Sequence, residues 1–110
     1  MRDYNLYIED ILTATKSIEK YTKGLNFLDF KKNNLIIDAV VRNLEIIGEA
    51  AKNIPPNLRN KAPQIEWKKI CGLRDILAHE YFGVDVEVVW DILKNKLPDL
   101  KKKIKTLRRV

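Results

Sequence analysis

The sequence predicts an all-α fold, an up-and-down bundle of four principal helices with one extra short helix. Apolar residues recur at intervals of three and four along most of the chain, which is typical of amphipathic helices rather than strands. Only four glycines and four prolines interrupt the 110 residues, so helices joined by short connections are expected. This length suits a single domain, residues 1–110, with a modest core.

The first helix is expected at residues 3–23, with Gly24 as the signal that ends it. Its inward face carries residues at three- and four-residue spacing: Tyr4, Ile8, Ile11, Thr15 and Ile18. A short segment at residues 25–30 then leads to the second helix.

The second helix, expected at residues 31–53, is apolar around most of its circumference and is ended by the proline pair at positions 55–56. Its central seam is formed by Ile36, Val40, Asn43, Ile47, Ala50 and Ile54. The seam is widened by Leu35, Ile37, Val41, Leu44, Ile46 and Ala51. A helix that is apolar on more than one side has more than one packing partner. We therefore expect this helix to serve both the bundle core and the subunit interface of a homodimer.

The second half of the chain begins with a short helical turn or loop at residues 57–63. The third helix is expected as one unbroken element at residues 66–82, with a glycine cap at its end. Asp85 has the side chain of an N-cap and begins the last helix. That helix packs through Val86, Val89, Leu93, Leu97, Leu100, Ile104 and Leu107. Pro98 lies inside it and should kink or split it.

The composition is that of an ordinary globular protein, with 45% hydrophobic and 33% charged residues. No apolar run approaches the roughly 20 residues of a membrane span and nothing reads as a signal peptide, so we expect a cytoplasmic protein without membrane contact. The single Cys71 excludes an internal disulfide. One histidine and one cysteine cannot build a tetrahedral zinc site, so neither a metal nor a cofactor is expected.

The net charge of +6 is concentrated near the C-terminus. The cations crowded there are Lys101, Lys102, Lys103, Lys105, Arg108 and Arg109. Such a run can attract a polyphosphate or an acidic protein, and an RNA-binding module built on this tail is one possible function. The plainer interpretation is the solvated face of a terminal helix.

The candidate chemistry lies in residues 74–81, which contain the only histidine of the chain. If residues 66–82 form one helix, Arg74 falls near the middle of an apolar arc, where an unpartnered guanidinium is costly. Asp75 and His79 are four residues apart, so the carboxylate can orient the imidazole. An anion-binding cation beside an oriented proton carrier suits chemistry on a phosphodiester. The alternative is a buried salt bridge from Arg74 to Glu45 or Glu49, with a surface histidine.

Arg74 and His79 match the R-x-x-x-x-H signature of the HEPN ribonucleases, which this chain resembles. The extension to Tyr81 is similar to the R-x-x-x-x-H-x-Y motif of the HepT-like toxin branch. The segments at residues 39–50, 63–67 and 79–85 agree in the same order, so the resemblance covers roughly residues 3–104.

The resemblance implies a helical bundle that dimerises, with the two motifs facing each other across a cleft. It implies metal-independent cleavage of RNA by the toxin of a type II toxin–antitoxin system. It also implies a partner antitoxin, an MNT-type nucleotidyltransferase, which would transfer AMP onto Tyr81 and silence the toxin.

The residue types support such a mechanism independently. Metal-free cleavage needs a base for the ribose 2′-OH, an acid for the leaving 5′-oxygen, and a cation for the charge on the transition state. His79 can act as base or acid, and Arg74 can hold the phosphate in a bidentate fork. One imidazole cannot easily fill both proton roles, so a twofold dimer that brings two copies together is expected. The products would be a 2′,3′-cyclic phosphate and a 5′-hydroxyl.

Two further residues complete the candidate site. Tyr81 is seven residues beyond Arg74, and an AMP group on its phenol would block the cleft and neutralise the cation; the alternative is an aromatic residue packing near a helix end. Asn43 lies centrally in the apolar seam of the second helix, where a buried amide needs hydrogen-bond partners. It forms either a structural bond to the backbone or to Arg74, or a contact that lines the cleft. We expect Asn43, and Asp75 beside His79, to support the catalytic residues rather than to act on the substrate themselves.

One rival function belongs to a different class. The chain could be a non-catalytic helical subunit that docks a nucleotidyltransferase, with Tyr81 serving only as a modification target.

Overall fold

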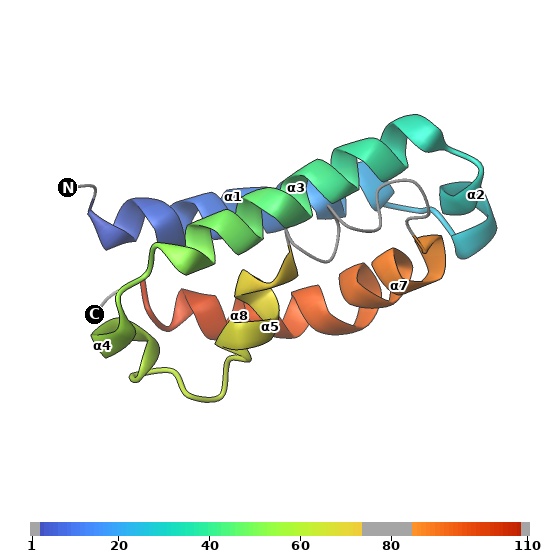
Figure 1. Ribbon diagram of the computed structural model, residues 1–110. Helices are drawn as coiled ribbons and strands as arrows, with labels where there is room; N and C mark the ends of the chain where they lie inside the picture. Colours follow the sequence, from blue (N-terminus) through green and yellow to red (C-terminus); the bar gives the residue numbers. More distant parts are fainter. Residues whose placement is uncertain (1–2, 74–84, 109–110) are drawn as a thin grey trace.

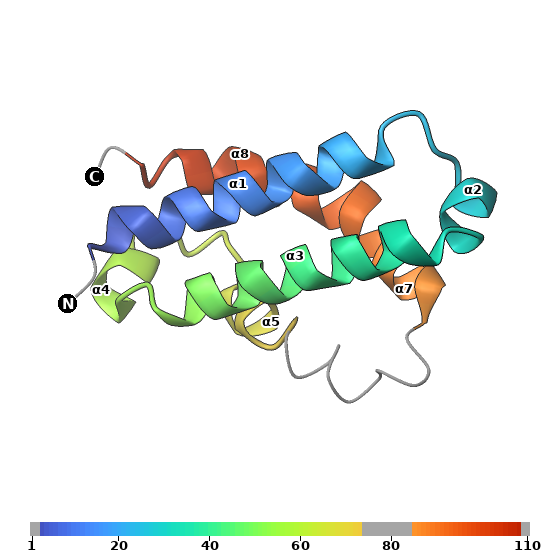
Figure 2. The same cartoon turned by 90° about the horizontal axis from the view of Figure 1, so that it is seen from above.

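The computed structural model describes residues 3–73 and 85–108, and every regular element in these two ranges is helical (Figure 1). The all-α prediction is therefore confirmed for the described part of the chain. Two long helices, α1 (Tyr4–Thr22) and α3 (Asn34–Lys52), lie side by side and run in opposite directions. A second layer below them contains the C-terminal helical elements and the short helix α5 (Trp67–Cys71) (Figures 1 and 2).

The hydrophobic core fills the space between these two layers. Its largest fully buried side chains are Phe30, Ile8, Ile11, Leu12, Ile18, Leu44, Ile47, Ile54, Ile104, Leu107, Val40 and Val89. The predicted inward face of the first helix is confirmed, including Thr15, whose buried hydroxyl donates to the carbonyl of Leu12 at 2.8 Å. That bond removes the cost of burying the hydroxyl group.

Side-chain caps set the beginnings of the first helices. Asp3 caps α1 by accepting from the backbone N–H of Asn5 at 3.0 Å. Asn26 and Asp29 form a reciprocal capping box at α2 (Phe27–Lys31). Asn33 accepts from the N–H of Ile36 at 3.1 Å and starts α3. The predicted start of the second helix at residue 31 is therefore wrong, because this second cap separates two helices.

The C-terminal end of α3 is held by a single arginine from α4 (Pro56–Arg59). The Arg59 guanidinium donates to the carbonyls of Ile54, Ala51 and Lys52 at 2.9 to 3.0 Å. These carbonyls belong to the last turn of the helix and its exit, where helical i to i+4 partners run out; the Ala51 carbonyl also accepts from the Ile54 N–H at 3.2 Å. The fork of donors thus satisfies them and supplies a cation at the negative end of the helix dipole.

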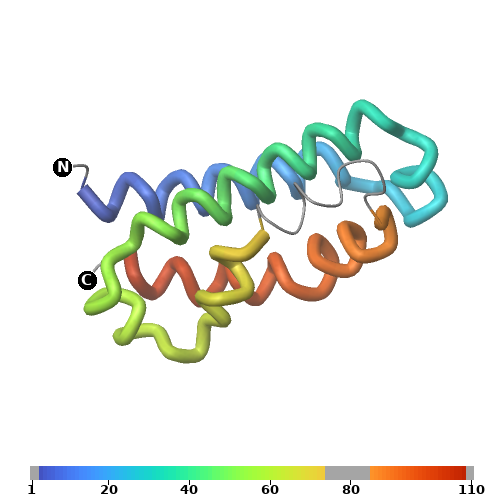
Figure 3. The backbone as a smooth tube through the Cα atoms, viewed as in Figure 1, coloured from blue at the N-terminus to red at the C-terminus, as the bar shows by residue number. Residues whose placement is uncertain are grey.

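The last helix is interrupted where proline was expected to disturb it. It consists of α7 (Val86–Asp91), a π-helical turn η2 (Ile92–Lys96) and α8 (Leu97–Lys105), which follow one another along one path (Figure 3). Pro98 lacks an N–H group and its ring crowds the carbonyl four residues earlier, so the wider π-turn before it relieves the conflict. The predicted kink or split is confirmed.

The third helix departs from its prediction at Gly72. Within the described residues α5 ends at Cys71, and Gly72 is its C-cap, with its N–H directed to the carbonyls of Lys68 and Ile70. Glycine is a poor helix former and favours helix ends, so the single unbroken helix over residues 66–82 is wrong at this point. Arg74 and the rest of its expected apolar arc beyond Leu73 lie outside the described residues, so the position of Arg74 in that arc stays a prediction. The expected glycine cap at position 83 lies outside the described residues.

Candidate functional site

The residues of the R-x-x-x-x-H-x-Y motif, Arg74, Asp75, His79 and Tyr81, lie outside the described residues. Their roles are therefore predictions from the sequence. The structure describes the two elements that border the motif and the helix that carries the fifth predicted residue, Asn43.

The element before the motif is fixed firmly to the rest of the bundle. The Trp67 indole N–H donates to the carbonyls of Arg59 and Ala62 at 3.2 and 3.1 Å, which ties α5 to the loop after α4. The Arg59 guanidinium lies 5.9 Å from the Trp67 ring centroid. Leu73, the last described residue before the motif, is buried. The end of α5 lies beside the middle of α3 in both views (Figures 1 and 2).

The element after the motif begins with the cap that the sequence predicts. The Asp85 carboxylate accepts from the backbone N–H groups of Glu87 and Val88 at 3.0 and 3.4 Å. Further along α7, Trp90 packs against Phe30 with ring centroids 5.1 Å apart. Both borders of the motif are thus attached to the core, one through α5 and one through α7.

Asn43 is half-buried on α3, and α3 contacts α5. Its side-chain amide donates to the carbonyl of Ala39, one turn earlier, at 2.8 Å. This is the backbone bond that the structural interpretation of Asn43 requires. A role in lining a cleft stays a prediction.

Two large apolar side chains of α3 are exposed on its outward side. Leu35 is 80% exposed and Ile46 is 37% exposed, and both lie on the same side of the helix as Asn43. Two apolar residues that the sequence placed in a buried face therefore have solvent around them within a single chain. An exposed apolar strip next to the border of the motif is a feature expected of a subunit interface.

A hollow of about 470 Å³ opens between α5 and the C-terminal elements. Its floor is apolar, with Ile70 and Leu100 among the lining residues, and its rim carries the exposed ion pairs Glu66–Lys69 and Asp99–Lys103, each at 2.7 Å. The hydrogen bond from Lys69 lowers the pKa of the Glu66 carboxyl, and the same bond raises the pKa of Lys69. Sequence reasoning missed this hollow because its walls come from distant segments. The described charged side chains on its rim are paired with one another and solvated.

The basic tail is partly neutralised by acids from α1. Lys101 pairs with Glu19 at 3.0 Å, and Arg108 pairs with Glu9 at 2.8 Å. Lys103 pairs with Asp99 and also donates to the carbonyl of Gln64 at 3.2 Å. These cations hold the C-terminal segment against its neighbours, so part of the charge of the tail is neutralised.

No group of three or more histidine, cysteine or acidic side chains in the ranges 3–73 and 85–108 could hold a metal ion. Within the same ranges, no helix is both long enough and apolar enough to cross a membrane.

Residues 11–107 match the protein family described as "Ribonuclease HepT-like", and this match includes the whole motif. The chain therefore belongs to the HepT-like ribonuclease family. It is 44% identical over 108 residues to "Probable ribonuclease HepT" of Thermococcus cleftensis, covering 98% of each chain. It is 43% identical over 101 residues to "Putative RNase TTE0752" of Caldanaerobacter subterraneus subsp. tengcongensis, covering 92% of this chain and 90% of the other.

No solved structure is significantly similar to this chain. The family match nevertheless confirms the resemblance inferred from residues 74–81 and the prediction of an endoribonuclease.

Proposed function

We propose that this protein is the toxin of a type II toxin–antitoxin system, a cytoplasmic homodimer that cleaves RNA without a metal ion. The observation that carries the proposal is the match of residues 11–107 to the HepT-like ribonucleases, with Arg74, His79 and Tyr81 all present at motif spacing. The neutralising partner is a nucleotidyltransferase that transfers AMP onto Tyr81.

The reaction is an internal transfer at phosphorus. His79 of one subunit removes the proton from the 2′-OH, and the 2′-oxygen forms a bond to the phosphorus. The bond from phosphorus to the 5′-oxygen breaks, and the second His79 gives that oxygen a proton. Arg74 stabilises the charge that builds on the nonbridging oxygens. Asp75 orients the imidazole, and Asn43 supports the cleft from α3.

The number of histidines in the chain argues for a dimer. The chain has one histidine, while the reaction needs a base and an acid in the same turnover. A twofold axis next to the motif would place two imidazoles and two guanidinium groups in one cleft. The exposed strip of α3 with Leu35 and Ile46 supports this arrangement, because a second subunit would remove it from water.

The first prediction concerns the reaction. The purified protein should cleave single-stranded RNA in the presence of EDTA and leave a 2′,3′-cyclic phosphate and a 5′-hydroxyl on the fragments. Mass spectrometry of the fragments identifies both ends. A protein that leaves RNA intact, or that cleaves only when magnesium is added, contradicts the mechanism.

The second prediction concerns neutralisation. Co-expression with a nucleotidyltransferase encoded beside this protein should increase its intact mass by one AMP group, and peptide mapping should place this group on Tyr81. The Tyr81→Phe variant should stay unmodified and toxic during co-expression. If the modified protein still cleaves RNA at the rate of the unmodified one, the silencing role of Tyr81 is refuted. If RNA is never cut but Tyr81 is modified, the chain is the docking subunit considered above.

A further inference from the structure

Two ion pairs fasten the C-terminal elements to α1 along one line. Lys101 pairs with Glu19 at 3.0 Å, and Arg108 pairs with Glu9 at 2.8 Å. Lys101 on α8 pairs with the later acid of α1 and Arg108, just beyond α8, pairs with the earlier one, so α1 and α8 run antiparallel. The contact between α1 and α8 runs along the edge of the molecule opposite α5 (Figure 2).

Two lysines lie between these ion pairs, one on each helix. Lys16 is seven residues after Glu9 and three before Glu19, so it shares their side of α1. Lys105 is four residues after Lys101 and shares its side of α8. Both lysines are exposed.

Two more lysines extend the line beyond the Lys101–Glu19 pair. Lys23 and Lys94 both line a hollow of about 260 Å³, together with Glu19. Lys94 lies 4.7 Å from the ring centroid of Trp90, and Lys23 is four residues beyond Glu19. We call Lys16, Lys23, Lys94, Lys105 and the paired Lys101 and Arg108 the basic seam.

The charge on the basic seam is not balanced. Its two carboxylates, Glu9 and Glu19, are already occupied by Arg108 and Lys101. Among the described residues no carboxylate pairs with Lys16, Lys23, Lys94 or Lys105. From Glu9 to Lys23 the seam is about 21 Å long at 1.5 Å per residue. It is thus a linear row of uncompensated positive charge.

A linear polyanion fits this row better than a protein or a membrane does. Protein partners and lipid surfaces are held mainly by apolar and aromatic anchors. Of the exposed large apolar side chains of α1, Tyr21 lies on a side of the helix turned away from Lys16 and Lys23. Leu6 is three residues before Glu9 and lies beside the end of the row, so neither side chain provides an apolar anchor along its length. Successive phosphates of a nucleic-acid strand need only a row of lysines and arginines.

We propose that the basic seam binds the sugar–phosphate backbone of single-stranded RNA outside the cleavage site. The choice of RNA rests on the proposed ribonuclease function. The seam holds a flanking part of the substrate by charge, without reading its sequence. It adds equally to the binding of substrate and transition state, so removing it raises KM and leaves kcat unchanged.

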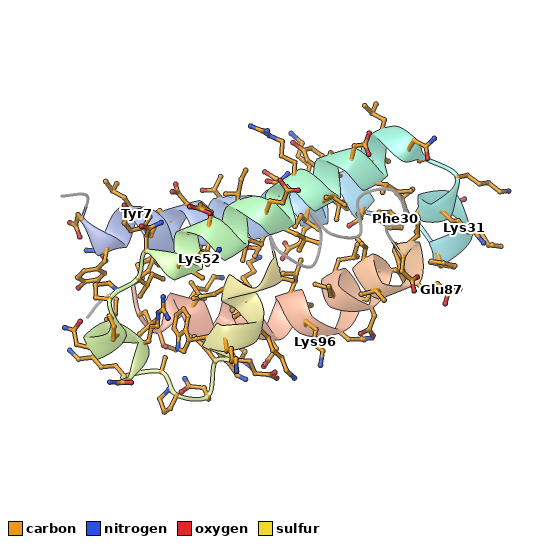
Figure 4. All side chains as sticks on the ribbon, viewed as in Figure 1. Tyr7, Phe30, Lys31, Lys52, Glu87 and Lys96 are labelled. Carbon is orange, nitrogen blue, oxygen red and sulfur yellow. The ribbon has the colours of Figure 1, made fainter. Side chains whose placement is uncertain are left out.

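The test compares two variants with the same net charge. The seam variant carries Lys16→Gln, Lys23→Gln, Lys94→Gln and Lys105→Gln. The control carries glutamine at four exposed lysines scattered over other elements: Lys31, Lys52, Lys61 and Lys68. Figure 4 shows Lys31 and Lys52 on different parts of the molecule. Thermal unfolding verifies that both variants fold.

The probe is a fluorescent 2′-O-methyl oligouridylate, which lacks the attacking hydroxyl and cannot be cleaved. Anisotropy titrations at several salt concentrations give the slope of log K against log salt. The slope of the wild-type protein is negative, and its magnitude should be smaller by about 3 in the seam variant. Each of the four phosphate contacts that this variant loses contributes about 0.7 on a single strand. The control should keep the slope of the wild-type protein.

Equal losses in both variants, or an unchanged slope in the seam variant, overturn the proposal. Loss of binding to polyglutamate with full retention of RNA binding also overturns it, because the seam would then be a surface for an acidic protein. Since the probe cannot be cut, the outcome does not depend on catalysis. A protein that binds through the seam but never cleaves RNA refutes the proposed function alone.

Discussion

Replacing His79 with alanine is expected to lower the rate of RNA cleavage by about 10²- to 10⁴-fold, the usual contribution of a positioned acid or base. The Arg74→Ala variant should lose activity by about 10²- to 10³-fold, because the charge on the transition state would lack its partner. Gel assays with a labelled RNA measure both rates. Circular dichroism and thermal unfolding should show that both variants keep the helical fold. A His79→Ala protein that retains wild-type activity refutes the assignment.

An experiment with mixed subunits distinguishes one site shared by two subunits from two independent sites. Wild-type and His79→Ala chains are co-refolded at known ratios, so that mixed dimers form in binomial proportion. If one cleft needs both imidazoles, activity should fall with the square of the wild-type fraction. A linear fall means that each subunit cleaves RNA by itself, which contradicts the two-histidine mechanism.

The Leu44→Ala substitution is expected to reduce the free energy of unfolding by about 3 to 5 kcal/mol, a large part of the stability of a small domain. Leu44 is on α3 and is 0% exposed, so the substitution leaves a cavity between the two layers. Urea unfolding followed by circular dichroism measures the change. Its magnitude tests whether α3 contributes the centre of the core.

Leu35→Ala is the matched control, since it makes the same chemical change on the same helix. Leu35 is 80% exposed in the single chain, so its substitution should change the free energy of unfolding of the monomer by less than about 0.5 kcal/mol. If the exposed strip of α3 is a subunit interface, Leu35→Ala should weaken association in analytical ultracentrifugation. Equal destabilisation of the monomer by both substitutions would contradict the described packing of α3.

Much of the fold is determined locally and could therefore be predicted. The inward face of α1 follows from three- and four-residue spacing, and the caps at Asp3 and Asp85 follow from side chains that accept from free N–H groups. The disturbance at Pro98 follows from a missing donor. Each of these depends only on residues within one or two turns of one another.

Errors arose where two local signals competed. Asn33 can cap α3 because α2 has already ended at Lys31. Apolar periodicity alone does not reveal that one helix ends and another begins here. At Gly72 the apolar pattern continues, while the poor helix propensity of glycine ends α5. The candidate site was selected by the spacing of Arg74, His79 and Tyr81 and by the family match, neither of which depends on packing.

By itself, the sequence determined that this chain is helical, that it carries the R-x-x-x-x-H-x-Y motif, and that it belongs to the HepT-like ribonucleases. Only the tertiary structure decided which charges are free. Lys101 and Glu19 are 82 residues apart in the chain, yet packing of α8 on α1 brings them to 3.0 Å. The same packing neutralises part of the basic tail and aligns lysines that pair with no carboxylate in the described part of the chain. Charge balance depends on neighbours in space, which a linear pattern does not contain.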